Sequence, residues 1–197
     1  MMKKIAIFAS GGGSNFKAIH KNIELGNICA KIKLLVSNNS NSGAVEYAAE
    51  NNIETFIINK ARFSDMIKGE NLLLKKLVFN QIDLICLAGY MKLLSRKIVE
   101  KYDNCILNIH PALLPKFGGK GFYGMKVHEA VLESGVEESG ATVHLVNENY
   151  DEGQIIAQKK IMINSNYTPE ILSKKVLQIE HELYSKVIKE FCENKLI

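Results

Sequence analysis

The chain has 197 residues, of which 47% are hydrophobic, and a formal net charge of +4 at pH 7. This length suits one sizeable α/β domain, and the apolar content excludes an intrinsically disordered chain. The lysines are spread without a basic, aromatic-rich block and no apolar run approaches about 18 residues, so we expect neither a nucleic-acid groove nor a membrane span.

The cysteines and the amino terminus favour a cytoplasmic protein. There is no C-x-x-C pair, and Cys86 and Cys105 lie in apolar runs, so we expect buried, reduced thiols. The apolar run after Lys4 ends at Ser10. It is shorter than the apolar region of about 7–15 residues that a signal peptide needs.

Short apolar runs rich in β-branched residues alternate with helical patterns through the first half of the chain. This alternation is typical of a parallel sheet with helices on both faces. The predicted strands are 5–9, 32–37, 55–58, 84–88 and 105–109, and the predicted helices are 15–24, 43–51, 63–80 and 95–101.

The second half begins with a segment rich in Gly and Pro, 111–123, which we expect to be a long ordered loop of functional importance. A helix at 124–134, strands at 141–146 and 154–163, and a last helix at 169–193 follow; Thr168 can cap the last helix and Pro169 suits its first turn. We predict a single domain over 1–197 with a Rossmann-like, doubly wound, mostly parallel sheet.

A glycine-rich turn, Ser10-Gly11-Gly12-Gly13-Ser14-Asn15, lies between the first predicted strand and helix. Glycines let backbone amides approach a ligand, and a helix N-terminus favours an anion, so the turn predicts a phosphate site with side-chain donors from Ser14 and Asn15. A P-loop is excluded because the Gly-Lys-Ser/Thr sequence is missing. A dinucleotide site is disfavoured because Phe16 replaces the third glycine and Asn38 follows the second strand where an acidic residue is expected.

Asn108 and His110 project from the same face of one strand, because residues two apart share a face, and Pro111 ends the strand. Ligands bind at the carboxyl ends of parallel strands. A carboxamide and an imidazolium can both donate to an oxyanion, and a histidine moves protons near neutral pH. The pair therefore predicts acyl transfer to a substrate amine.

A carboxylate is then needed to keep His110 charged, and Asp151 or Glu152, in a turn between the last two predicted strands, can supply it. Position in the sequence does not choose between them. His144 is interpreted as a residue of the core or its rim. His128 starts an H-E-x-x-H pattern that Leu132 breaks, so no zinc site is predicted.

With these residues in place, nearly the whole chain resembles the phosphoribosylglycinamide formyltransferases, a family of the formyl-folate transferase superfamily. The resemblance rests on the glycine-rich turn, on Asn-x-His-Pro-x-Leu-Leu-Pro at 108–115 and on three shorter segments. Those segments are Leu87-Ala88-Gly89-Tyr90-Met91, Gly140-Ala141-Thr142-Val143-His144 and Asp151-Glu152-Gly153.

The resemblance implies formyl transfer from 10-formyltetrahydrofolate to the glycinamide amine of 5'-phosphoribosylglycinamide in purine (IMP) biosynthesis. The amino-terminal half would bind the ribonucleotide, the carboxyl-terminal half the folate, and no metal is implied. The implied catalytic residues are Asn108, His110 and Asp151; those implied for the ribonucleotide are Gly13, Ser14, Asn15 and Glu180; those implied for folate are Met91, Lys92, Leu93, Leu94, Asn108, Val146 and Met66.

The chain departs from the family at two places. The family often has an arginine for the folate tail where this chain has Met66, so Arg62 or Lys68 is a substitute, and 117–123 is a longer variant of its segment. The other hypotheses are a formyltetrahydrofolate deformylase, a methionyl-tRNA formyltransferase-like enzyme, and a non-catalytic nucleotide- or folate-binding regulator. We expect small-molecule partners only, and a monomer or weak homodimer.

Overall fold

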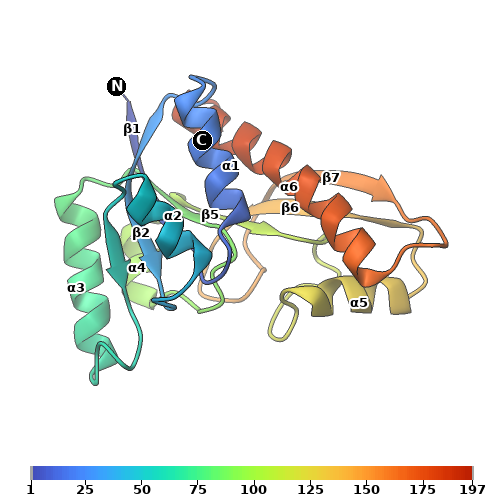
Figure 1. Ribbon diagram of the computed structural model, residues 1–197, viewed down its shortest axis with the longest axis horizontal. Coiled ribbons are helices and arrows are strands. Elements are labelled where there is room, and N and C mark those ends of the chain that lie inside the picture. The colour runs from blue at the N-terminus through green and yellow to red at the C-terminus, as the bar shows by residue number, and fades with distance from the viewer. Residues whose placement is uncertain (1, 197) are drawn as a thin grey trace.

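The computed structural model describes residues 2–196, which build one seven-stranded sheet with the order β3-β2-β1-β4-β5-β6-β7 (Figure 1). The first five strands pair in parallel, and β6 and β7 add to the β5 side in antiparallel orientation. The strands are β1 Lys3–Phe8, β2 Ala30–Ser37, β3 Thr55–Ile57, β4 Leu84–Leu87, β5 Ile106–His110, β6 Glu138–Leu145 and β7 Ile155–Met162.

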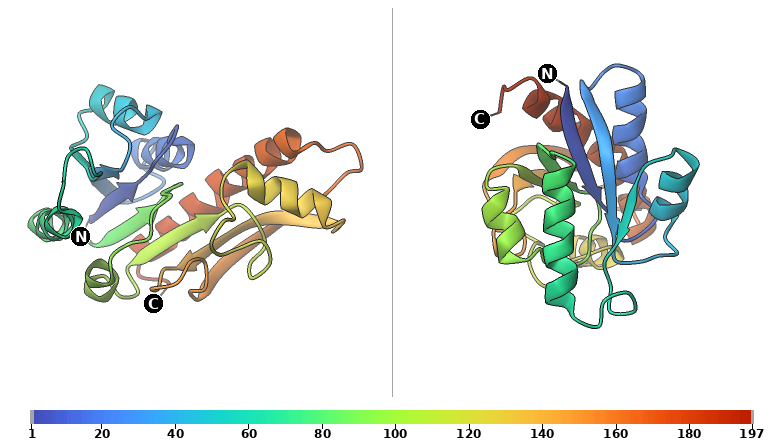
Figure 2. Two further views of the ribbon diagram at one scale, coloured as in Figure 1. Left: turned by 90° about the horizontal axis from the view of Figure 1, so that it is seen from below. Right: turned by 90° about the vertical axis from the view of Figure 1, so that its left-hand side faces the viewer.

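Within the described residues, six helices cover the sheet: α1 Ser14–Glu24, α2 Gly43–Glu50, α3 Met66–Phe79, α4 Arg96–Lys101, α5 Met125–Glu133 and α6 Pro169–Cys192. Side chains of β1 alternate between two apolar clusters. Ile5 and Ile7 pack with α1, α2, α5 and α6, whereas Ala6 and Phe8 pack with α3 and α4 on the other face. Figure 2 shows helices on both sides of the sheet.

The predicted fold class, an α/β sheet that is mostly parallel with helices on both faces, is confirmed. The largest boundary differences lie at α3, which begins three residues later than predicted, and at β6, which begins three residues earlier. α3 begins late because the Asp65 side chain caps it by accepting from the amide of Lys68. β6 extends back through Gly140, a strand position where a Cβ would overlap the carbonyl of Lys159.

The cysteines differ from the expectation of buried thiols. All four are free within the described chain, but only Cys86 is buried, whereas Cys29 is exposed and Cys105 and Cys192 are partly exposed. Cys86 lies inside β4 between two layers of helices, and Cys105 precedes β5 instead of lying within it. Within residues 2–196, none of the helices is long and apolar enough to cross a membrane.

Candidate active site

Three neighbouring parallel strands, β1, β4 and β5, end at one edge of the sheet. Ligands of open α/β sheets bind at this edge. The turns that follow β1 and β4 are joined by hydrogen bonds: the Ser10 amide donates to the Gly89 carbonyl over 3.1 Å, and the Met91 amide donates to the Ser10 hydroxyl over 3.0 Å. The glycine-rich turn and the strand end that carries Asn108 therefore share this edge.

Asp151 links the two side chains predicted from the strand end. Asn108 Nδ2 donates to Asp151 Oδ1 over 3.3 Å, and His110 Nδ1 lies 3.5 Å from Asp151 Oδ2. Glu152 is exposed and accepts instead from Asn149 Nδ2 over 2.8 Å. Position in the sequence left Asp151 and Glu152 open and the resemblance implied Asp151; in the structure, Asp151 is the carboxylate next to His110.

His144 completes the cluster, and sequence reasoning had interpreted it only as a core or rim residue. Its Nε2 lies 3.0 Å from Asn108 Nδ2 and 3.5 Å from Asp151 Oδ1. Its Nδ1 lies 2.7 Å from the carbonyl oxygen of Leu145. A carbonyl can only accept, so Nδ1 carries the proton of the neutral ring and Nε2 accepts from Asn108. Both N–H groups of Asn108 are therefore held by protein acceptors.

His110 is buried, with an acceptor at each ring nitrogen. Nε2 lies 2.8 Å from the carbonyl oxygen of Phe117, and Nδ1 faces Asp151. Burial lowers the pKa of His110 below its usual value of 6.5; the Asp151 carboxylate and the Phe117 carbonyl oppose this effect and His144 adds to it. Burial therefore opposes the charged ring that the sequence analysis expects, whereas the acceptors at its two nitrogens favour it.

Asp151 is ionised in this environment. Burial favours a higher pKa for its carboxyl group, but the neighbouring imidazoles of His144 and His110 and the Gly119 amide at 2.9 Å outweigh burial and lower its pKa below the usual 3.8. The turn that carries Asp151 lies so close to β6 that a Cβ on Gly153 would overlap the Leu145 carbonyl. The glycine of the Asp-Glu-Gly segment therefore sets where the carboxylate lies.

The glycine-rich turn leads directly into α1. Gly13 has φ 72°, a left-handed conformation, and a Cβ there would lie 2.9 Å from the Cβ of Ala44 on α2. Only glycine suits both constraints. Gly11 and Gly12 are exposed and Ser14 is partly exposed. The start of α1 consequently lies beside an open surface, as an anion site requires.

Asn15 does not turn its side chain toward this surface. It is 6% exposed, and its Nδ2 donates over 2.6 Å to Oε2 of Glu180, which is 8% exposed. The expected contribution of the Asn15 side chain to the phosphate site is therefore corrected: the side chain binds Glu180, 165 positions away. Burial raises the pKa of Glu180 to about 7, although the bond from Asn15 acts in the opposite direction.

Buried Glu180 predicts a pH-dependent stability. Its pKa is raised from 4.5 to about 7 in the folded chain, so its effect on stability is most favourable below pH 4.5 and is lost as the pH rises toward 7. The loss is on the order of 3 kcal/mol. In urea unfolding at several pH values, Glu180→Gln should remove this decline. The control Glu182→Gln, on the exposed face of α6, should keep it; equal pH dependence in both variants would contradict the prediction.

The residues expected to bind folate differ in how exposed they are. Met91, Lys92 and Leu93 are exposed directly after β4, next to the Ser10 turn. Leu94 is buried and Val146 partly buried against the cluster under α3 and α4, and the Val146 amide donates to the Ile106 carbonyl of β5. Met66 packs against the same cluster at the start of α3. Arg62 and Lys68 are exposed.

Comparison with known proteins shows the family of the chain. The formyl transferase family model matches residues 3–188. The chain is 47% identical to the chloroplastic phosphoribosylglycinamide formyltransferase of Arabidopsis thaliana, over 98% of this chain and 67% of the relative. It is 37% identical to phosphoribosylglycinamide formyltransferase of Bacillus subtilis, over 96% of this chain and 94% of the relative.

A solved structure shares the whole fold. Glycinamide ribonucleotide transformylase 1 from Symbiobacterium toebii matches with a TM-score of 0.91 and 32% identity, over 100% of this chain and 90% of that chain. The chain spans only 67%, 62% and 65% of the lengths of the three plant relatives, about two thirds. The resemblance predicted from the motifs is confirmed by these matches.

Proposed function

The chain belongs to the formyl transferase family, and we propose that it transfers a formyl group from 10-formyltetrahydrofolate to the amine of 5'-phosphoribosylglycinamide in purine (IMP) biosynthesis. One observation carries the proposal: Asn108, His110 and Asp151 form a cluster at the sheet edge that also holds the glycine-rich turn. Two groups that can donate hydrogen bonds and one carboxylate beside an anion site suit transfer of an acyl group to a phosphorylated amine.

The ribonucleotide binds at the amino-terminal part of this edge. Backbone amides from Gly13 to Asn15, with the Ser14 hydroxyl, hold the phosphate. Glu180 accepts a hydrogen bond from the glycinamide end, and Asn15 keeps the Glu180 carboxylate in place. This division assigns the first half of the single domain to the ribonucleotide and the second half to folate.

The folate supplies the formyl group. Exposed apolar side chains beside the cluster, Met91 at 52% and Leu93 at 47% exposure, suit a flat aromatic ring. Lys92, Leu94 and Val146 complete this region through backbone and apolar contacts. Met66 lies on α3 with exposed Arg62 and Lys68 near it in sequence, and one of these two cations pairs with the tail of the folate.

Asn108 and His110 stabilise the negative charge that develops on the formyl oxygen as the amine attacks the formyl carbon. Asn108 uses the N–H that now points to Asp151, because this bond, at 3.3 Å, is longer than the one to His144, at 3.0 Å. His110 donates through Nε2, whose present acceptor is the Phe117 carbonyl. The Asp151 carboxylate favours the protonated form of the His110 ring. Together, His110 and Asp151 pass the proton that the attacking amine loses to the leaving nitrogen of folate.

Related functions differ in their acceptor. A deformylase would pass the formyl group to water, and a methionyl-tRNA formyltransferase-like enzyme would need a tRNA surface. A regulator would not need the catalytic residues to meet at one carboxylate. We retain a monomer or weak homodimer and a cytoplasmic location as proposals, although the plant relatives carry the word chloroplastic in their names.

The test is to mix the purified protein with 5'-phosphoribosylglycinamide and 10-formyltetrahydrofolate and to follow tetrahydrofolate release and formylated product. Both should rise together. Release of tetrahydrofolate with free formate, independent of the amine, would identify a deformylase and contradict the proposal.

A further inference from the structure

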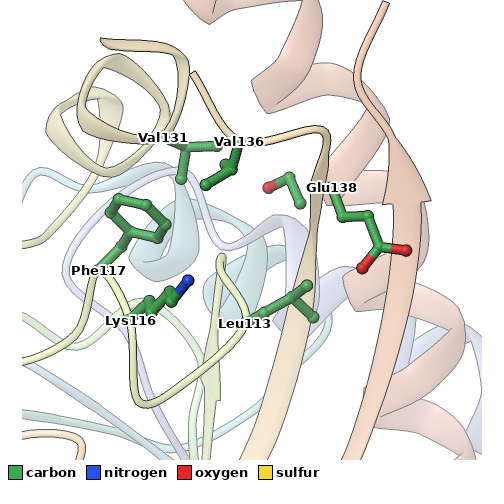
Figure 3. Close-up of a pocket in the computed structure, with 7 residues that line it drawn as sticks. Leu113, Lys116, Phe117, Val131, Val136 and Glu138 are labelled. Carbon is green, nitrogen blue, oxygen red and sulfur yellow. The ribbon is translucent and has the colours of Figure 1, made fainter. Parts of the chain in front are cut away.

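A cavity of about 130 Å³ lies behind the loop that contacts His110. Its wall combines that loop, the end of α5 and the start of β6, as Figure 3 shows. An apolar cavity of about 150 Å³ holds a molecule the size of benzene, so this space suits about six or seven non-hydrogen atoms. The lining residues are Leu113, Lys116, Phe117, Val131, Val136, Glu138 and Ser139.

Two polar groups of the lining, the Ser139 hydroxyl and the Lys116 amine, have no hydrogen-bond or ion-pair partner among the described residues. Ser139 is 2% exposed, and within residues 2–196 its Oγ has no hydrogen-bond partner. A buried hydroxyl without a partner is unfavourable, so a ligand that hydrogen-bonds to it is favoured. Lys116 is exposed and forms none of the ion pairs found between described residues.

The only acidic side chain of the lining is already neutralised. Glu138 Oε2 lies 2.8 Å from Nζ of Lys160 on β7. The remaining lining is the ring of Phe117 and the aliphatic side chains of Leu113, Val131 and Val136. The site therefore combines one available cation, one buried hydroxyl and an apolar wall.

From this combination we propose that the cavity binds a small branched aliphatic carboxylic acid, with its hydrocarbon against the valines and its carboxylate between Lys116 and Ser139. A monoanion fits better than a neutral molecule because Lys116 offers the unmatched charge. A dianion would not suit, since its second charge would lie against aliphatic side chains and desolvation of a charge is costly.

The same loop reaches the catalytic cluster. The carbonyl of Phe117 accepts from His110 Nε2 over 2.8 Å, and Phe117 itself has φ 58°, a left-handed conformation that is costly for a bulky residue. A ligand packed against the Phe117 ring stabilises this backbone conformation. If the chain has the proposed function, the bound acid also inhibits it. The acid keeps Nε2 of His110 bonded to the Phe117 carbonyl and away from the formyl oxygen, and so slows formyl transfer.

Binding can be measured directly by titrating the protein with 3-methylbutanoate and observing amide shifts in ¹H–¹⁵N NMR spectra. We expect a Kd on the order of 1 mM, since a ligand of about seven non-hydrogen atoms has little binding energy. Shifts should centre on Lys116, Phe117 and Ser139. The neutral 3-methylbutanamide should bind at least about tenfold more weakly, which corresponds to about 1.4 kcal/mol.

Two variants test the assigned contacts. Lys116→Met should weaken binding of 3-methylbutanoate about tenfold, whereas Lys120→Met, an equal charge change at an exposed lysine outside the lining, should leave it unchanged. Ser139→Ala removes only the hydroxyl group and should weaken binding of 3-methylbutanoate a few-fold. Equal binding by the amide and the acid, or equal loss in both lysine variants, would overturn the assignment.

Inhibition of formyl transfer by the bound acid is measured separately from binding. Formyl transfer by the wild type should fall as the cavity fills, with the same concentration dependence as the NMR shifts, and Lys116→Met should need about tenfold more acid for the same inhibition. Binding without inhibition would overturn the coupling to His110. If the protein bound the acid but lacked formyl transfer with every acceptor, the proposed function would fail while the cavity site stood.

Discussion

Replacing Asn108 by Ala is expected to lower kcat for formyl transfer about 10²–10³-fold, the loss that follows removal of one oxyanion donor. The KM for the ribonucleotide should change much less, because the proposed phosphate contacts lie in the glycine-rich turn. The side chain is only partly buried at the end of β5, so its truncation opens little core. Steady-state kinetics of the purified variant give kcat and KM separately.

The control for this variant is Asn27→Ala. Asn27 is exposed, and its side chain donates to Asn22 Oδ1 far along the chain from the cluster. It should retain the wild-type kcat. A kcat within about twofold of wild type for Asn108→Ala would remove Asn108 from the mechanism, since even weak donors contribute more than that.

Replacing Asp151 by Asn should lower kcat about 10²–10⁴-fold, the contribution typical of a positioned acid or base. The variant loses the charge that raises the pKa of His110, so burial acts unopposed by that carboxylate and the pKa of His110 falls further. The ring then holds its second proton only at a lower pH. The His110 ring can be titrated by NMR in wild type and variant alongside the kinetics.

Glu152→Gln is the matched control, because Glu152 is the adjacent residue and is exposed, with its side chain bound to Asn149. It should leave kcat and the His110 titration unchanged. An Asp151→Asn variant in which His110 titrates at the wild-type pH would show that the 3.5 Å approach of the two side chains does not couple them.

The sheet and the core of the cluster were predictable because they follow from local patterns. Alternation along β5 placed Asn108 and His110 on one face, and the change from strand to glycine turn located the edge where ligands bind. The Asp-Glu-Gly turn was found as a candidate, but the choice of Asp151 over Glu152 depends on how that turn packs against β6.

What the sequence did not predict are contacts that depend on register or on backbone groups. His144 faces Asn108 because β5 and β6 pair antiparallel with those two residues opposite each other, and a pattern within one strand does not reveal that register. The acceptor for His110 is the Phe117 carbonyl, a backbone group present at every residue.

The contact of the Asn15 side chain was not predicted for a related reason. Its place in the Gly-Ser-Asn turn suggested a phosphate donor, but the first turn of α1 packs against α6, where Glu180 needs a partner in the buried interface. A buried carboxyl group requires a hydrogen bond, and Asn15 is the group that reaches it. The Gly140-Ala-Thr-Val-His segment was the one sequence signal that could have identified His144.

The most direct test of the account is a crystal structure of the protein with 5'-phosphoribosylglycinamide and a stable analogue of 10-formyltetrahydrofolate. We expect the phosphate on the backbone amides of the glycine-rich turn, and the oxygen that mimics the formyl oxygen within hydrogen-bond reach of Asn108 and His110. A ternary complex with the phosphate elsewhere, or with His110 Nε2 still on Phe117 and the formyl mimic out of its reach, would contradict it.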